Sequence, residues 1–113
     1  METTRQQKIA RQIQKDLGEI FLRDLFRLLD GAMVSVTAVR VSPDLGYAKV
    51  YLSIFPFEKK DVVMASVEKN NWLIRKSLGA RIRNQLRVVP ELAFFLDDSL
   101  EYIENIDQLL REE

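Results

Sequence analysis

The segment from Trp72 to Pro90 carries basic side chains and no acidic one. A second group of cations lies in the first fifteen residues, beside a single carboxylate. The cations of the two groups are Arg75, Lys76, Arg81, Arg83 and Arg87, and Arg5, Lys8, Arg11 and Lys15. Guanidinium and ammonium groups gathered on one surface bind phosphate. The chemistry that these residues favour is therefore the binding of a polyphosphate.

The sign of the charge reverses from residue 91 onward. That tail holds one cation, Arg111, and eight carboxylates: Glu91, Asp97, Asp98, Glu101, Glu104, Asp107, Glu112 and Glu113. The formal net charge is +0, but a local basic surface attracts phosphate even when distant carboxylates cancel the sum. Like charges crowded together repel, so this segregation indicates either a solubility role or a partner of opposite charge.

The composition argues against catalysis and against a bound cofactor. Histidine and cysteine are both absent, which removes the commonest proton shuttle and the thiol nucleophile. No phosphate-binding glycine loop or nucleophile elbow occurs. Asp97-Asp98 raises the question of a metal site, but the spacing matches no ion-binding loop. We expect that the protein is not an enzyme, that it binds no cofactor and that it has no dedicated metal site.

At 113 residues, 47% of them hydrophobic, the chain predicts one compact domain over residues 1–113. No stretch approaches the roughly 18 apolar residues of a membrane span, and the start lacks a signal-peptide hydrophobic region. The lack of cysteine is compatible with a reducing compartment. We expect a cytoplasmic monomer with no membrane partner.

The first element that must position these charges is an N-terminal helix. Thr3 or Thr4 can cap it, and the turn signal Asp30-Gly31 predicts that it ends near Leu29. Its apolar positions fall on one face, opposite the cations: Ile9, Ile13, Leu17, Ile20, Phe21 and Leu28. Residues 34–42 are rich in β-branched side chains and are predicted to form a strand. In residues 47–55 apolar and polar side chains alternate, as in a second strand. The turn residues from Pro43 to Gly46 lie between them, which predicts an antiparallel hairpin.

After Pro56 the period becomes helical again. We predict a helix reaching about Lys69, a break at Asn70-Asn71, and a second helix from Trp72 to about Leu86. The second helix buries Ile74, Leu78, Ile82 and Leu86, while Lys76, Arg83 and Arg87 share a neighbouring face. Arg75 lies closer to the apolar stripe, with its methylenes on the core and its guanidinium reaching out.

Pro90 bars helix continuation, residues 91–96 read as a third strand, and Ser99 caps an acidic closing helix over 99–111. The apolar positions of that closing helix are Leu100, Ile103, Ile106, Leu109 and Leu110. The predicted order is α-β-β-α-α-β-α. This is an α+β fold with a three-stranded sheet packed on helices.

Three blocks, "VTAVRVSPDLGYAKVYLS", "IRKSL" and "VPELAFFLDDS", resemble the ribosome-binding factor A family of small-subunit assembly factors. The resemblance covers nearly the whole chain. It implies a type-II KH-like fold in which a kink between the two central helices replaces the GXXG loop. It also implies binding to free or immature small ribosomal subunits and their ribosomal RNA, whose maturation the family assists. The further partners expected from this resemblance are ribosomal proteins and a ribosome-assembly GTPase.

The family pattern implies an Ala-X-Gly kink before the Ile-Arg pair, where this chain has Asn70, Asn71 and Trp72. A tryptophan there either stacks on an unpaired base or covers the helix junction as part of the core. The usual burial of large aromatic side chains favours the core interpretation.

Two other patterns allow more than one interpretation. The N-terminal cations, taken alone, are typical of a solvated helix face, but their occurrence with the acid-free segment favours phosphate binding. Tyr47, Lys49 and Tyr51, with Phe95 beside them, could form an RNA-stacking sheet face; we favour cross-strand packing, because the aromatic signature of such sheets is missing.

Our hypothesis is that both basic regions form one surface for folded ribosomal RNA. The candidate RNA-binding residues are Arg5, Lys8, Arg11, Lys15, Asn70, Asn71, Trp72, Arg75, Lys76, Arg81, Arg83 and Arg87. The alternative is a protein-interaction module that has no RNA role and uses the acidic closing helix or the aromatic strand face.

Overall fold

The computed structural model describes residues 3–97. The predicted closing helix over 99–111 lies outside them. The described part follows the predicted order α-β-β-α-α-β, with short helical turns between some elements. The elements are α1 (Thr4–Glu19), η1 (Ile20–Asp24), η2 (Phe26–Leu29), β1 (Met33–Val41), β2 (Tyr47–Phe55), η3 (Phe57–Lys59), α2 (Lys60–Lys69), α3 (Asn71–Ile82) and β3 (Glu91–Leu96).

The three strands form one sheet in the order β1-β2-β3, with β1 and β2 antiparallel and β2 and β3 parallel. The predicted alternation in β2 is confirmed, because Ala48, Val50, Leu52 and Ile54 are buried while the intervening side chains face outward. The register of β1 shifts between Val36 and Ala38, which is a β-bulge at Thr37.

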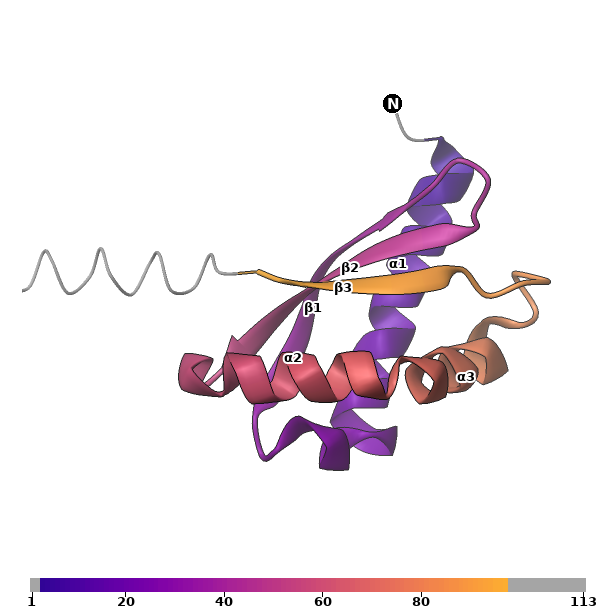
Figure 1. The fold of residues 1–113 in the computed structure, drawn as a ribbon. Coiled ribbons are helices and arrows are strands. Elements are labelled where there is room, and N and C mark those ends of the chain that lie inside the picture. The colour runs from indigo at the N-terminus through magenta and orange to yellow at the C-terminus, as the bar shows by residue number, and fades with distance from the viewer. Residues whose placement is uncertain (1–2, 98–113) are drawn as a thin grey trace, which may run out of the picture.

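The helices cover one face of this sheet. Figure 1 shows α1 crossing behind the strands, while α2 and α3 run end to end below them in the view. Fully buried side chains from these helices form one hydrophobic core with the inner face of the sheet: Ile13, Leu17, Val63, Val67, Ile74 and Leu78. The opposite face of the sheet carries no helix within residues 3–97. None of the described helices is long and apolar enough to cross a bilayer.

The start of α1 is fixed by a reciprocal cap. Thr3 Oγ1 accepts a hydrogen bond from the Gln6 backbone N–H at 3.1 Å, and Gln6 Oε1 accepts one from the Thr3 N–H at 2.9 Å. Gln6 Nε2 also donates to the carbonyl of Val41 at 2.9 Å. One buried amide therefore joins the first turn of α1 to the end of β1.

Replacing Gln6 with leucine should lower the free energy of unfolding by about 1–3 kcal/mol, because the buried Val41 carbonyl and the helix N-terminus both lose a partner. Urea denaturation would measure the change. The matched control is Gln7→Leu on the exposed neighbouring residue, which should stay within about 0.5 kcal/mol of the parent protein. Equal losses for the two variants would contradict this assignment.

The prediction that the first helix continues to Leu29 is wrong, because α1 ends at Glu19. The Leu25 N–H donates to the Ile20 carbonyl at 2.8 Å, which widens the next turn into a π-helix, and a 3-10 turn follows. An uninterrupted helix would turn Leu29 about 120° away from Leu17. The interruption instead buries Leu29 at 2% exposure and leaves Leu22 and Phe26 in solvent.

Both predicted turns are present. Asp30 and Gly31 adopt positive φ angles of 51° and 78°, which end the helical region as expected. In the hairpin turn the positive φ belongs to Leu45, at 60°. Asp44 accepts hydrogen bonds from Ser42 Oγ at 2.6 Å and the Gly46 N–H at 3.0 Å, and these bonds lower the pKa of the Asp44 carboxyl.

Candidate nucleic-acid interface

The break between α2 and α3 is confirmed and is one residue long. Asn70 leaves the helical region, with φ −104° and ψ 21°, and its side-chain amide donates to the Ser66 carbonyl at 2.8 Å. The amide of Asn71 donates to the Leu92 carbonyl at 2.9 Å, which ties the start of α3 to β3. Both asparagine side chains thus hold the kink in place.

Trp72 lies on the surface, with 66% of its area exposed, so the favoured core interpretation is wrong. The helix explains why: Trp72 precedes Ile74 by two positions, which is about 200° around α3. Ile74, Leu78 and Ile82 occupy the sheet-facing side. Trp72 therefore shares the outward face with Lys76 and Arg83, both of which are exposed.

The predicted second helix also ends early, at Ile82 instead of about Leu86. The chain then turns back along α3 to reach β3, while Leu86 stays buried at 7% exposure. We call residues 83–90 the return loop. Gly79 lets this loop lie close to α3, because a Cβ at that position would stand 3.0 Å from Cγ2 of Val89.

Arg75 fastens the return loop to α3. Its Nε donates to the Pro90 carbonyl at 3.1 Å and its Nη2 donates to the Val89 carbonyl at 2.6 Å. The sequence placed this guanidinium outward, toward a ligand. The structure shows it holding the loop instead.

Between α3 and the return loop lies a groove of about 460 Å³, which we call the α3 groove. The groove is lined by Trp72, Arg75, Lys76, Gly79, Arg87, Val88 and Val89. None of these side chains is acidic, and three are cationic. An exposed indole beside two exposed cations, Lys76 and Arg87, can stack on a base and pair with its flanking phosphates.

Replacing Arg75 with alanine should lower the free energy of unfolding by about 1–3 kcal/mol, because two carbonyls of the return loop lose a charged donor. Arg75→Lys should recover only part of the loss, since an ammonium cannot reproduce the guanidinium fork. Urea denaturation would measure both. Lys76→Ala is the matched control on the exposed face and should change stability by less than about 0.5 kcal/mol. An Arg75 variant as stable as this control would show that the two hydrogen bonds of Arg75 do not stabilise the return loop.

Arg81 is engaged elsewhere. Its Nη1 lies 2.6 Å from Glu19 Oε2 and its Nη2 lies 3.0 Å from Asp24 Oδ2. The hydrogen bond to Asp24, with a smaller contribution from Glu19, raises the pKa of the Arg81 guanidinium. This pairing joins α3 to the end of α1, so we leave Arg81 out of the RNA-binding set proposed below.

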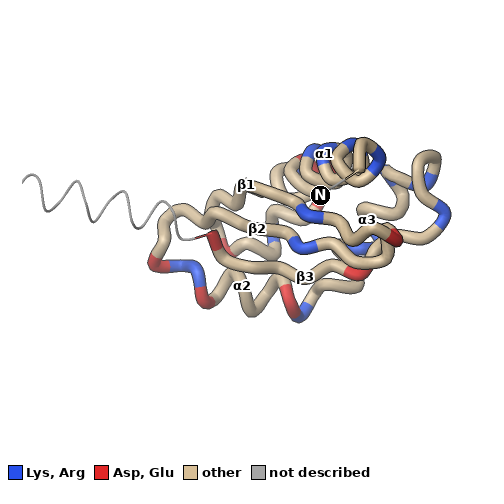
Figure 2. The backbone as a smooth tube through the Cα atoms, turned by 90° about the horizontal axis from the view of Figure 1, so that it is seen from above, with Lys and Arg blue, Asp and Glu red and all other residues tan. Residues whose placement is uncertain are grey.

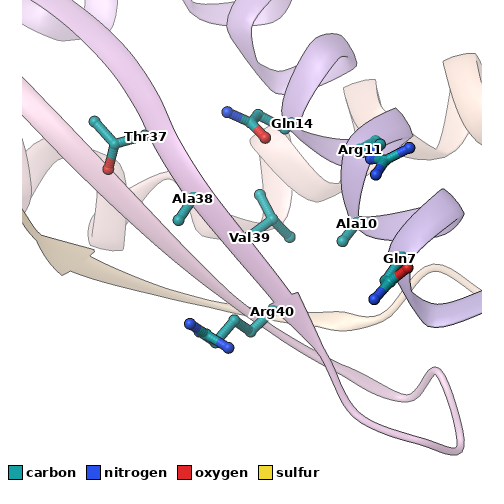
Figure 3. Close-up of a pocket in the computed structure, with 8 residues that line it drawn as sticks. All are labelled: Gln7, Ala10, Arg11, Gln14, Thr37, Ala38, Val39 and Arg40. Carbon is teal, nitrogen blue, oxygen red and sulfur yellow. The ribbon is translucent and has the colours of Figure 1, made fainter. Parts of the chain in front are cut away.

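The four N-terminal cations are exposed on α1, and none of them lines the α3 groove. In Figure 2 the blue segments of α1 and of the return loop lie toward the same end of the molecule. Arg11 instead lines a hollow of about 330 Å³ between α1 and β1, to which Arg40 also contributes; in Figure 3 the Arg40 side chain extends away from α1. In Figure 1, however, α1 begins at the top of the view while α3 lies at the lower right, so the first turns of α1 do not lie beside the groove, which α3 and the return loop line.

The open face of the sheet supports the packing interpretation of its aromatic residues. The rings of Tyr51 and Phe95 stack with centroids 5.5 Å apart and an interplanar angle of 29°. The same face holds a pair of cations that sequence reasoning missed: Arg40 and Lys49 are directly opposite in the strand register. Like charges in this position disfavour the sheet, and counting outward from the predicted turn at Pro43 to Gly46 would have placed the two residues opposite each other.

Within the described residues 3–97, no three acidic, histidine or cysteine side chains gather as metal ligands would. Asp98 of the predicted Asp97-Asp98 pair lies outside this range. The feature that the described residues do present is a groove with an exposed indole and several cations that face solvent.

Comparison with known proteins gives consistent results. The family model described as Ribosome-binding factor A matches residues 5–110. Ribosome-binding factor A of Flavobacterium psychrophilum is 49% identical over 111 residues, covering 97% of this chain and 85% of the relative. That of Cytophaga hutchinsonii is 44% identical over 110 residues, covering 97% and 83%.

Among solved structures, the crystal structure of ribosome-binding factor A from Thermus thermophilus has a TM-score of 0.67 at 22% identity, over 80% of this chain and 93% of that one. A homology model of the Thermus thermophilus factor, fitted into a cryo-EM map of a 30S complex, has a TM-score of 0.63 at 24% identity, over 79% and 91%. These likenesses confirm the KH-like α+β fold.

Proposed function

The chain belongs to the ribosome-binding factor A family, and from that premise we propose that it binds free or immature small ribosomal subunits and assists the maturation of their ribosomal RNA. The fit of a Thermus thermophilus relative into a map of a 30S complex supports the choice of partner. Binding acts without catalysis: it stabilises one arrangement of the RNA over another, and the protein leaves when that preference is lost.

The observation that carries this proposal is the α3 groove. Trp72 is 66% exposed at the mouth of a groove whose charged lining residues are all cations, including Lys76 and Arg87. An exposed tryptophan beside cations is suited to bind an unpaired base together with the phosphates that flank it. Arg83 continues the same face of α3 beyond the groove.

Through this surface the protein recognises chiefly the phosphates and the shape of the RNA. Lysine and arginine contacts to the backbone fix position and carry little base specificity, while stacking accepts any base. The exposed cations of α1 add long-range attraction to the same polyanion. We infer that the protein works in the cytoplasm as a monomer, with ribosomal proteins and a ribosome-assembly GTPase as further partners.

A sucrose-gradient profile tests the proposal. The protein should travel with free small subunits and not with complete ribosomes. Its co-sedimentation should weaken steeply as salt rises from about 0.05 to 0.2 M, because each phosphate contact releases counterions. Binding that ignores both salt and substitutions in the α3 groove would favour the protein-interaction alternative.

A further inference from the structure

A second surface of the molecule is apolar and has no occupant among residues 3–97. A groove of about 390 Å³ lies between the end of α1, the turns η1 and η2, and the first half of β1, and no charged residue lines it. Leu22, Phe26 and Met33 stand around it with 71%, 58% and 69% of their areas exposed. We call it the β1 edge groove. Large apolar side chains clustered in this way indicate a docking surface.

The β1 edge groove continues into the basic hollow described above. Gln14 lines both, and its amide donates to the Val36 carbonyl at 3.0 Å on the wall that they share. Figure 3 shows the basic end, where α1 brings Arg11 and Gln14 opposite β1. Lys15 is exposed one turn after Arg11 on the same side of α1. The combined surface is apolar at one end and cationic at the other.

We propose that residues 98–113 of this chain dock in the β1 edge groove. Their sequence repeats apolar residues at a spacing of three or four, at Leu100, Ile103, Ile106 and Leu110, which is the pattern of an amphipathic helix that lies in a groove. The same segment holds six carboxylates and one arginine. Its net charge of −5 balances the +5 of residues 1–97, which carry sixteen cations and eleven carboxylates.

The place where the described chain ends favours this occupant. Thr37 Oγ1 donates to Asp97 Oδ2 at 2.7 Å, and the Asp97 N–H donates to the Leu52 carbonyl at 2.7 Å. Residue 97 is thereby held against the bulge of β1, and Val36, next to that bulge, lines the groove. The last described residue is therefore joined by its side chain to the strand that forms one wall of the groove.

The lengths also match. A helix from Leu100 to Arg111 would be about 17 Å long, and Arg11 in the basic hollow and Leu22 in the β1 edge groove are separated by roughly the same distance at helical rise. With the apolar side chains in the groove, the flanking carboxylates of Glu101 and Glu104 could approach Arg11 and Lys15. A second copy of the chain or a ribosomal protein would need only the apolar match, whereas this segment also supplies the complementary charge.

Disulfide formation tests the proposal, because the chain contains no cysteine of its own. The full-length double variant Met33→Cys/Ile106→Cys should form an intramolecular disulfide at least about tenfold faster than Val62→Cys/Ile106→Cys. Val62 is a fair control because it is an exposed apolar residue on α2, at 55% exposure. Adding Leu22→Glu and Phe26→Glu to the first pair should remove most of its advantage.

Equal rates for the two pairs would overturn the proposal, as would a fast rate that survives the two glutamates. Disulfides formed only between chains would assign the groove to a second copy and would also overturn it. The test uses no RNA, so its failure leaves the proposed function untouched, and a failure of RNA binding does not affect it.

Discussion

Replacing Lys76, Arg83 and Arg87 together with glutamate should abolish co-sedimentation with free small subunits and lower the affinity for small-subunit RNA by at least about 100-fold near 0.15 M salt. Three charge-assisted contacts to phosphate are lost and replaced by repulsion. A 100-fold loss of affinity corresponds to about 2.7 kcal/mol, which is a low estimate for the loss of three such contacts. The slope of the logarithm of the binding constant against the logarithm of salt concentration should also fall, by about 2 to 3. A filter-binding titration at several salt concentrations would measure both quantities.

The matched control changes the net charge by the same amount at other places on the surface. Arg23, Arg27 and Lys49 are exposed, and none of them lines the α3 groove. Their replacement by glutamate should weaken RNA binding by less than about tenfold, through the long-range field alone. All six substituted positions are exposed, so both triple variants should keep the circular dichroism spectrum of the parent protein. Equal losses of binding in the two variants would show that net charge, and not the groove, governs the interaction.

Trp72→Ala should weaken binding to single-stranded segments of small-subunit RNA by about 5- to 150-fold, the equivalent of roughly 1–3 kcal/mol for one stacked base. The free energy of unfolding should change by less than about 0.5 kcal/mol, because the indole is exposed and no core contact is lost. Trp72→Phe should keep a part of the affinity. Fluorescence titration of the parent protein with RNA would show the same contact as quenching of its single tryptophan.

The opposite pattern would restore the core interpretation of Trp72. A variant that loses several kcal/mol of stability, yet binds RNA as the parent protein does, would show that the indole supports the helix junction. The combination of the two measurements matters, because a fall in RNA binding that merely follows unfolding would be uninformative.

The strands could be predicted almost to the residue because their signal is local. The alternation from Tyr47 to Phe55 and the block after Pro90 each match one strand in the structure. The kink could be placed as well, since paired asparagines disfavour helix continuation. The KH-like fold itself came from resemblance, not from periodicity.

Helix ends were harder to predict because they depend on packing. Leu29 is buried only if the helical period is broken, and nothing near Ile20 in the sequence marks the π-turn that breaks it. The position of Trp72 was misjudged for a different reason. The general burial of tryptophan was given more weight than the helical phase set by Ile74 and Leu78, which already placed it outward.

The candidate site could be predicted only as a set of residue types. The sequence shows that the cations of α3 lie in one acid-free segment, but it cannot show which of them are engaged by other parts of the protein. Arg75 is bound to the return loop and Arg81 to two carboxylates, and both sets of partners are distant in the chain. Composition therefore indicated phosphate binding, and tertiary contacts selected the residues available for it.

If the α3 groove faces ribosomal RNA on the small subunit, a photocrosslinker placed beside the groove should react with that RNA. Ala80 is exposed on α3 one turn beyond Lys76, and Ala65 is an exposed alanine on α2. Each can be changed to the only cysteine of the chain and labelled with a benzophenone photocrosslinker. After irradiation in complex with free small subunits, we expect strong crosslinks to ribosomal RNA from position 80 and few from position 65. Crosslinks from position 80 to ribosomal proteins alone, or RNA crosslinks of equal yield from both positions, would contradict this prediction.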